Sequence, residues 1–275
     1  MSKSKIPEKQ IYEVLGTLNG KVGLYIENCE TNEKFTINED ILFPCASVIK
    51  IPMVAMLLKD GNEGRIDLNQ SHAIKASNRV GGTGILCNLD FRFNPTMRDL
   101  GKLMIMLSDN TATNEVIDIL DENRFNQFCK EQGYHSTIWQ RKMLDFEAIK
   151  KGKNNYMSTR DIGEMLSRIA REEWLSKEIC NNIFSYMCGQ KYRNKLPAKL
   201  PVVECYEGKN IIPQGKVLVG NKTGDLDCIQ HDVGIFELPD NTRYVIAIFT
   251  SDLPNNFEGI ECISSISKVV YDAFK

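Results

Sequence analysis

The chain has 275 residues, of which 42% are hydrophobic and 25% are charged, and its formal net charge is −2. This length fits one large domain or two closely packed ones. The balanced charge argues against a nucleic-acid-binding surface. No apolar run approaches the roughly 18 residues that cross a bilayer, so no membrane span is expected.

Residues 1–9 carry charge without a following apolar stretch, so they do not have the pattern of a signal peptide. The sequence as it stands predicts a cytoplasmic protein, or a secreted one if an export signal preceding Met1 has been removed. Its nine cysteines and three scattered histidines lack metal-ligand spacing. We therefore expect no metal and no cofactor, and buried free thiols typical of a reducing compartment.

The hydrophobic spacing of residues 7–18 predicts a helix, and residues 21–37 predict a β-hairpin with a polar turn. From residue 47 to about 195 the pattern is helical. Two irregular stretches lie inside this helical block, a glycine-rich one at 79–84 and a longer one at 141–157, whose polar end reads as a solvated loop.

Strands return near the C-terminus at residues 216–219, 231–236 and 242–249, and residues 259–274 predict a closing helix. This order predicts an α+β fold. We expect an antiparallel sheet flanked by the terminal helices, with a helical lobe inserted between its strands.

The same order predicts the domain organisation. Residues 1–44 together with 200–275 would form the α/β lobe, and residues 45–199 an all-helical lobe. The active site is expected in the cleft between the two lobes.

Residues 43–59 contain a serine and a lysine three positions apart, followed by an almost unbroken apolar run. If Ser47 opens a helix, Lys50 shares its face, and a lysine whose charge is suppressed can take the serine proton. Ser-x-x-Lys alone is a weak signal, because it also occurs at residues 2–5 and 265–268. Only the middle copy opens an apolar helix that is expected to be buried.

Two further tripeptides fall where they could border the cleft. Residues 108–110, Ser-Asp-Asn, lie in a break between helices, and residues 222–224, Lys-Thr-Gly, follow the predicted strand 216–219. Each has a structural alternative, since the first is a good helix cap and the second a common strand-to-turn sequence.

Taken together in this order, the three motifs resemble those of the penicillin-recognising serine enzymes, and most of all the class A β-lactamases. The similarity extends to the flanking segments 43–50, 107–114, 155–161 and 231–234. It implies the fold of that family and a serine hydrolase that opens β-lactam amides through an acyl-enzyme. A small molecule is therefore the expected substrate.

The resemblance also implies catalytic roles. Ser47 would attack the carbonyl and become acylated, and Lys50 would accept its proton directly or through a water. The charge of Lys222 nearby would help to keep Lys50 neutral. Ser108 would relay a proton to the leaving nitrogen.

Binding roles follow in the same way. Asn110 would hold the side-chain amide of the substrate, and Lys222 and Thr223 would bind its carboxylate. The backbone N–H groups of Ser47 and Asp225 would form the oxyanion hole.

The pattern is broken where the family needs a second base to hydrolyse the acyl-enzyme. If Arg141 matches the family's loop arginine, the glutamate position falls at Met143, and the nearest carboxylates are Asp145 and Glu147. Either could be the deacylation base, or could simply pair with Arg141. The alternatives are a penicillin-binding-type peptidase or an amide or ester hydrolase with slow deacylation, and a non-catalytic sensor on the same scaffold.

Two other features depart from the resemblance. Asp225 stands where small or hydroxylated residues are usual, and its charge would weaken the binding of anionic β-lactams or favour another substrate. Cys45 and Cys228 lie close in sequence to the motifs and could be near each other. Neither matches the family's disulfide pattern, and a reducing compartment argues against a bridge.

Overall fold

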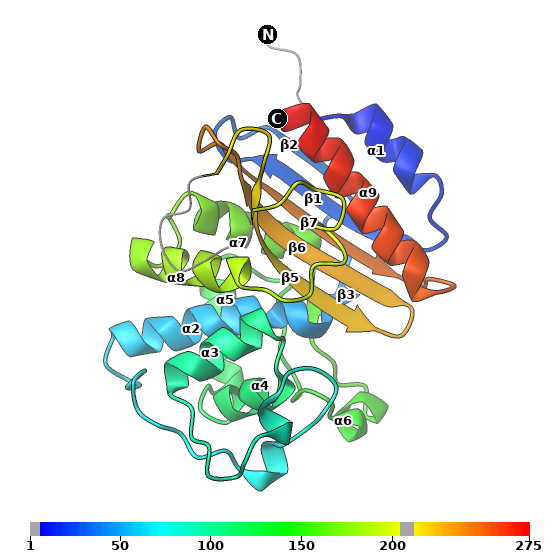
Figure 1. Cartoon of the computed structure of the whole chain (residues 1–275). Helices are drawn as coiled ribbons and strands as arrows, with labels where there is room; N and C mark the ends of the chain where they lie inside the picture. The colour runs from blue at the N-terminus through cyan, green and yellow to red at the C-terminus, as the bar shows by residue number, and fades with distance from the viewer. Residues whose placement is uncertain (1–5, 204–211) are drawn as a thin grey trace.

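The computed structural model describes residues 6–203 and 212–275 (Figure 1). The strands are β1 (Lys21–Asn28), β2 (Lys34–Ile37), β3 (Phe43–Pro44), β4 (Tyr156–Met157), β5 (Leu218–Leu226), β6 (Ile229–Glu237) and β7 (Arg243–Ser251). The α-helices are α1 (Glu8–Leu15), α2 (Lys50–Asn62), α3 (Met97–Met106), α4 (Asn110–Ile117), α5 (Glu122–Glu131), α6 (Phe146–Lys150), α7 (Thr159–Ala170), α8 (Lys177–Cys188) and α9 (Asn256–Phe274). Short 3₁₀ helices are η1 (Ala46–Ile49), η2 (Ala76–Asn78) and η3 (Leu86–Asn88).

One antiparallel sheet of five strands has the order β2-β1-β7-β6-β5. The N-terminal hairpin is thus joined to the C-terminal strands through β1 and β7, where Leu24 lies opposite Ile248. The terminal helices α1 and α9 pack side by side on one face of the sheet (Figure 1). The predicted α+β fold with flanking terminal helices is confirmed.

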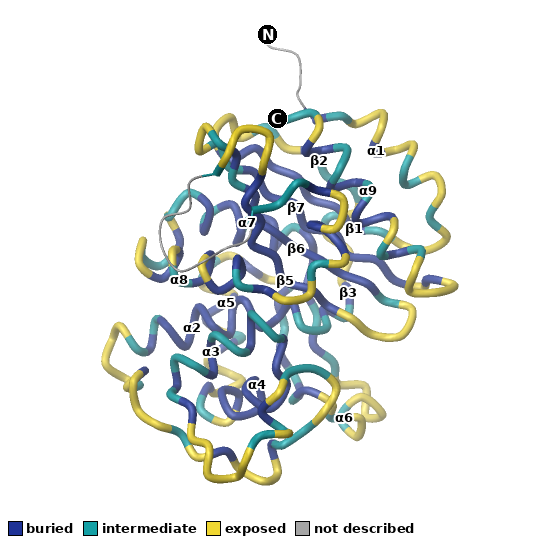
Figure 2. Tube along the Cα trace, viewed as in Figure 1, coloured by how far each residue is buried: buried dark blue, intermediate teal, exposed yellow. Residues whose placement is uncertain are grey.

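The opposite face of the sheet packs against α7 and α8. A side chain at Gly163 of α7 would place its Cβ 2.3 Å from the Tyr25 ring of β1, so glycine permits the close approach of helix and sheet. Beyond these helices, α2 to α6 form the helical lobe at the bottom of Figure 1. Figure 2 shows buried backbone both in the sheet and in α2, and one hydrophobic cluster includes residues of both.

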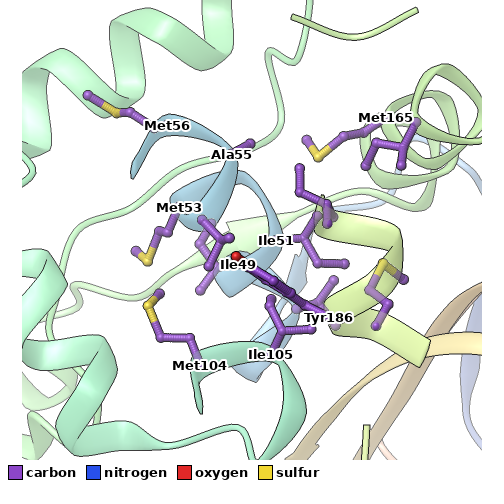
Figure 3. Packing of buried hydrophobic residues seen from close by; sticks show 14 of the residues in the cluster. Ile49, Ile51, Met53, Ala55, Met56, Met104, Ile105, Met165 and Tyr186 are labelled. Carbon is purple, nitrogen blue, oxygen red and sulfur yellow. The ribbon is translucent and has the colours of Figure 1, made fainter. Parts of the chain in front are cut away.

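Helix α2 is the centre of the helical lobe. Its residues from Lys50 to Leu58 are all buried, as the unbroken apolar run predicts. Figure 3 shows Ile49, Ile51 and Met53 surrounded by side chains from α3, α7 and α8. Full burial of such a side chain contributes about 1.5–3 kcal/mol, so this packing fixes where α2 begins and hence where its first lysine lies.

Three local predictions need correction. Ser47 lies in the 3₁₀ turn η1 that precedes α2, and not in the first turn of the α-helix itself. The strand predicted at 216–219 continues to Leu226, so residues 222–224 lie within β5. The polar residues in its second half hid the strand pattern. The stretch 141–157, predicted to be irregular, contains the short helix α6.

Over the residues that the structure describes, no helix combines the length and apolar character that a membrane span requires. The Ser-x-x-Lys copy at residues 2–5 lies outside the described residues.

Candidate active site

Hydrogen bonds from two other parts of the chain hold the segment just before Ser47. Just before it, the Cys45 N–H donates to the Asn155 carbonyl oxygen at 3.0 Å. The neighbouring Pro44 carbonyl accepts a hydrogen bond from His231 Nε2 of β6 at 2.9 Å. The residue that precedes Ser47 has a φ of 47°, which turns the chain sharply into η1. Ser47 itself stays partly exposed, at the mouth of a cavity.

Two buried lysines, Lys50 and Lys222, both lie within hydrogen-bond distance of the Ser108 hydroxyl. Lys50 Nζ donates to the Ser108 carbonyl oxygen at 2.6 Å and to Asn110 Oδ1 at 2.9 Å, and it lies 3.2 Å from Ser108 Oγ. Lys222 Nζ, on β5, lies 3.0 Å from the same Ser108 Oγ. The structure therefore brings the lysines of the first and third motifs together through the serine of the second.

This arrangement disfavours the charged form of Lys50. Burial is the main reason why the pKa of Lys50 lies well below its usual value, and the positive charge of Lys222 lowers it further. Burial also lowers the pKa of Lys222, to about 7, against the opposing effect of nearby aspartates. Both effects favour the neutral amine of Lys50, the form that can accept a proton.

The middle residue of the Ser-Asp-Asn motif has a structural role. Asp109 caps α4 by accepting from the Ala112 N–H at 2.9 Å. Its other oxygen accepts from the backbone N–H groups of Ile85 and Leu86. The helix-cap interpretation therefore holds for Asp109, while its two neighbours turn towards Lys50.

Ser47 opens onto a cavity of about 350 Å³. The polar residues on its wall include Ser108 and Asn110 from the helical lobe and Thr223 and Asp225 from β5. Lys50 and Lys222 lie behind this wall, fully buried. The other lining residues are Ala46, Gly82, Thr83, Arg141, Met143, Leu144, Phe146, Ile149, Tyr192, Asn194 and Leu226.

β5 is an edge strand and lies directly against η1. A Cβ atom at Gly224 would come within 3.2 Å of Ala46 and of the Cys45 carbonyl, so a larger residue would require these atoms to shift. Every second N–H of an edge strand points away from its sheet partner. The backbone of β5 therefore has donors available on the side of the Ser47 turn.

Sequence reasoning missed the residues that hold the loop 141–155. The Asn155 side chain accepts from the backbone N–H of Gln140 at 2.9 Å and donates to the Arg141 carbonyl at 3.1 Å. Asn114 likewise accepts from the Met143 N–H at 2.8 Å and donates to its carbonyl at 3.3 Å. Met143 is thus held in the cavity wall with its side chain buried.

The two loop carboxylates lie elsewhere. Asp145 caps α6 through the Ala148 N–H at 2.9 Å and lines a separate surface depression. The Glu147 side chain is 73% exposed and pairs with Lys150. Neither lines the cavity that contains Ser47. The guanidinium of Arg141 donates to Asn154 at 2.9 Å, instead of pairing with either carboxylate.

Asp225 has a partner that the sequence did not suggest. The buried Lys195 lies 2.7 Å from Asp225 Oδ1 and also donates to the carbonyl oxygens of Gly224 and His231. The negative charge predicted at Asp225 is therefore present but paired. Lys195 could not be found from sequence, because a lysine in an irregular segment is usually solvated.

Cys45 is buried and Cys228 is exposed at the β5–β6 turn, and both are free thiols. They form no disulfide with each other. Cys205 lies outside the described residues.

Comparison with known proteins places this site in a family. The sequence model described as "Beta-lactamase enzyme family" matches residues 6–274. The chain belongs to the beta-lactamase enzyme family. A beta-lactamase from Bacteroides uniformis is 28% identical over 94% of this chain and 88% of that relative.

Solved structures show the same relationship. The structure of PBP-A is 28% identical, with a TM-score of 0.83 over 97% of this chain and 95% of that chain. An ancestral class A beta-lactamase has a TM-score of 0.84 at 19% identity, over 97% of this chain and 99% of that chain. This beta-lactamase therefore has the fold of the class A enzymes. It is a serine β-lactamase-type hydrolase with a small-molecule substrate.

Proposed function

We propose that this beta-lactamase opens β-lactam amides by acylation of Ser47, with Lys50 as the proton acceptor. The observation that carries the proposal is the hydrogen-bonded set of Lys50, Ser108 and Lys222 behind the cavity that Ser47 faces. The lowered pKa of Lys50 provides a neutral amine for the serine proton. Ser108, in contact with both lysines, would pass a proton to the leaving nitrogen.

The substrate would be held by groups on both sides of the cavity. One Asn110 N–H donates to the Gly81 carbonyl at 3.0 Å, which leaves its second N–H for a substrate amide. Thr223 and Lys222 would bind a carboxylate. The N–H groups of Ser47 and Asp225 would stabilise the oxyanion, and removal of one such donor typically costs about 100- to 1000-fold in rate.

We further propose that the acyl-enzyme is long-lived, as in the penicillin-binding-type alternative. The support is Met143, an apolar side chain in the cavity wall at the position where the resemblance predicts the glutamate. Asp145 and Glu147 make other contacts, so we assign neither as the deacylation base.

Intact-protein mass spectrometry during a single exposure to penicillin G tests both statements. We expect a stoichiometric adduct on the wild type that decays slowly after excess ligand is removed. Ser47→Ala should form none, whereas Ser265→Ala, which alters another Ser-x-x-Lys copy, should react like the wild type. An adduct that survives in Ser47→Ala would remove the nucleophile assignment.

The non-catalytic sensor makes a different prediction. It requires that neither penicillin G nor a fluorophosphonate label Ser47. Nitrocefin turnover separates the remaining possibilities. Rapid turnover by the wild type with no detectable adduct would reject the long-lived acyl-enzyme but keep Ser47 as the nucleophile.

A further inference from the structure

The end of the cavity near β5 carries an aspartate whose placement is not explained by the acylation chemistry. Asp225 and Thr223 are alternate residues of one strand, so their side chains share a face, and both line the cavity. The Asp225 side chain is 52% exposed, so its carboxylate is accessible to a ligand in the cavity. A substrate bound against Thr223 would therefore lie next to the Asp225 carboxylate.

Lys195 holds this carboxylate in place. Its side chain is fully buried, and its three N–H donors have three acceptors: Asp225 Oδ1 at 2.7 Å, the His231 carbonyl at 3.0 Å and the Gly224 carbonyl at 3.3 Å. A lysine with all three donors occupied offers none to a ligand. Lys195 therefore acts through Asp225 and does not form a binding site itself.

The lysines at this end of the cavity have acidic neighbours. Two lysines, Lys195 and Lys222, are matched by two aspartates, Asp225 and the buried Asp232. Asp232 accepts from the Leu196 N–H at 3.0 Å and from the Asn221 amide, so it too is fixed. A substrate carboxylate held by Lys222 and Thr223 would therefore also lie near the Asp225 carboxylate, whose like charge opposes its binding.

We propose that the Lys195–Asp225 pair selects against substrates with a carboxylate beside the scissile bond and favours uncharged amides or esters. Asp225 is the specificity-determining residue and Lys195 the positioning residue. The inference rests on acylation of Ser47 as proposed above. It deepens that function by naming the charge class of the preferred substrate.

A matched pair of ligands tests the selection directly. Cephalothin and its methyl ester differ in one negative charge, and the ratio of their rate constants for acylation of Ser47 is the measurement. We expect the wild type to favour the ester. Asp225→Asn should raise the acid-to-ester ratio about tenfold, which corresponds to roughly 1.4 kcal/mol of relieved like-charge repulsion.

Two variants keep the test specific. Lys195→Met leaves the Asp225 charge uncompensated, so the acid-to-ester ratio should fall several-fold, and adding Asp225→Asn should restore it. Asp227→Asn removes an exposed charge that does not line the cavity, and should leave the ratio unchanged. A ratio of two rate constants is insensitive to the fraction of folded protein, so partial misfolding cannot mimic the result.

Other outcomes overturn the inference. An unchanged ratio in Asp225→Asn, or an equal change in Asp227→Asn, would show that Asp225 does not select substrate charge, while Ser47 acylation would stand. Absence of labelling by both cephalosporins and by a fluorophosphonate would instead reject the proposed function, and the charge selection with it.

Discussion

At the scale of single residues, the proposed slow release of the acyl-enzyme depends on Met143. A thioether cannot take a proton from water, so it provides no base for deacylation. The Asn114 amide holds the Met143 backbone on both sides, so a new side chain would enter the same part of the cavity wall. We expect Met143→Glu to shorten the lifetime of the penicillin G acyl-enzyme at least tenfold, measured by the decay of the adduct mass.

The matched control for this change is Ile149→Glu. It adds the same carboxylate to the same cavity, but from the exposed helix α6. If both variants shortened the lifetime equally, general charge in the cavity would be the cause, and the position of residue 143 would lose its significance.

The two buried lysines predict a bell-shaped pH dependence of acylation by an anionic β-lactam. Below its lowered pKa Lys50 is protonated and cannot accept the serine proton, so the rate constant rises with pH on the acid side. Lys222, with a pKa of about 7, loses its positive charge as the pH rises, so binding of a carboxylate weakens above neutral pH. Stopped-flow measurement of the acylation rate constant from acid to alkaline pH follows both limbs.

Substitution separates the two limbs. Lys222→Arg keeps a positive charge at all of these pH values and should abolish the alkaline decline. Lys216→Arg, at an exposed position just before the same strand, should leave the profile unchanged. An alkaline decline that persists in Lys222→Arg would assign that limb to another group.

At the scale of elements, His231 joins β6 to the segment before Ser47. Its Nε2 donates to the Pro44 carbonyl, its Nδ1 accepts from the Thr250 N–H at 3.2 Å, and its ring stacks on Phe249. Burial lowers the pKa of His231 to about 4, from 6.5 in an unfolded chain. The neutral ring thus adds stability above pH 6.5, which is lost as the pH falls towards 4.

This linkage predicts a measurable difference. Between pH 6.5 and 4 the free energy of unfolding should fall by up to roughly 3 kcal/mol more in the wild type than in His231→Gln. Urea denaturation at several pH values gives the difference. Comparison with the variant removes the contribution of Asp232, whose pKa is raised to about 6 by burial. The exposed His135→Gln should keep the slope of the wild type.

Element prediction from sequence succeeded where burial is uniform and failed where an element borders the cleft. The apolar runs of α2, β1 and β7 follow from burial on all sides, since the two strands lie between the two hydrophobic clusters. The centre of β5 contains Asn221, Lys222 and Thr223, whose polar side chains break the strand pattern. The 3₁₀ turn at Ser47 depends on contacts from β6 and from residue 155, which no local pattern contains.

At the scale of the whole molecule, the order of three motifs was enough to predict that distant side chains meet. Ser108 and Lys222 are 114 positions apart, yet their side chains are in hydrogen-bond contact. The partners that complete the site could not be predicted. Lys195, Asn114 and Asn155 belong to no motif, and each acquires its role only through tertiary contacts with Asp225, Met143 and Arg141.

One hydrophobic core extends through both the helical lobe and the sheet. One hydrophobic cluster includes Ile51 of α2, in the helical lobe, and Ile235 of β6, in the sheet. Both of the chain's tryptophans, Trp139 and Trp174, belong to this cluster and lie outside the sheet, so their fluorescence reports on the helical part of the molecule. If the lobes unfold as one unit, damage to the sheet must appear in this signal.

We therefore expect a single thermal transition in which Ile51→Ala and Ile235→Ala lower the tryptophan midpoint by similar amounts. Each removes a fully buried isoleucine, at a cost of about 2–5 kcal/mol. At about 2–4 °C per kcal/mol, the midpoint should fall by roughly 5–20 °C. The exposed Ile41→Ala should shift it little. If Ile235→Ala left the tryptophan midpoint unchanged while far-UV circular dichroism showed an earlier transition, the lobes would be separate folding units, and the cleft between them could open without unfolding either one.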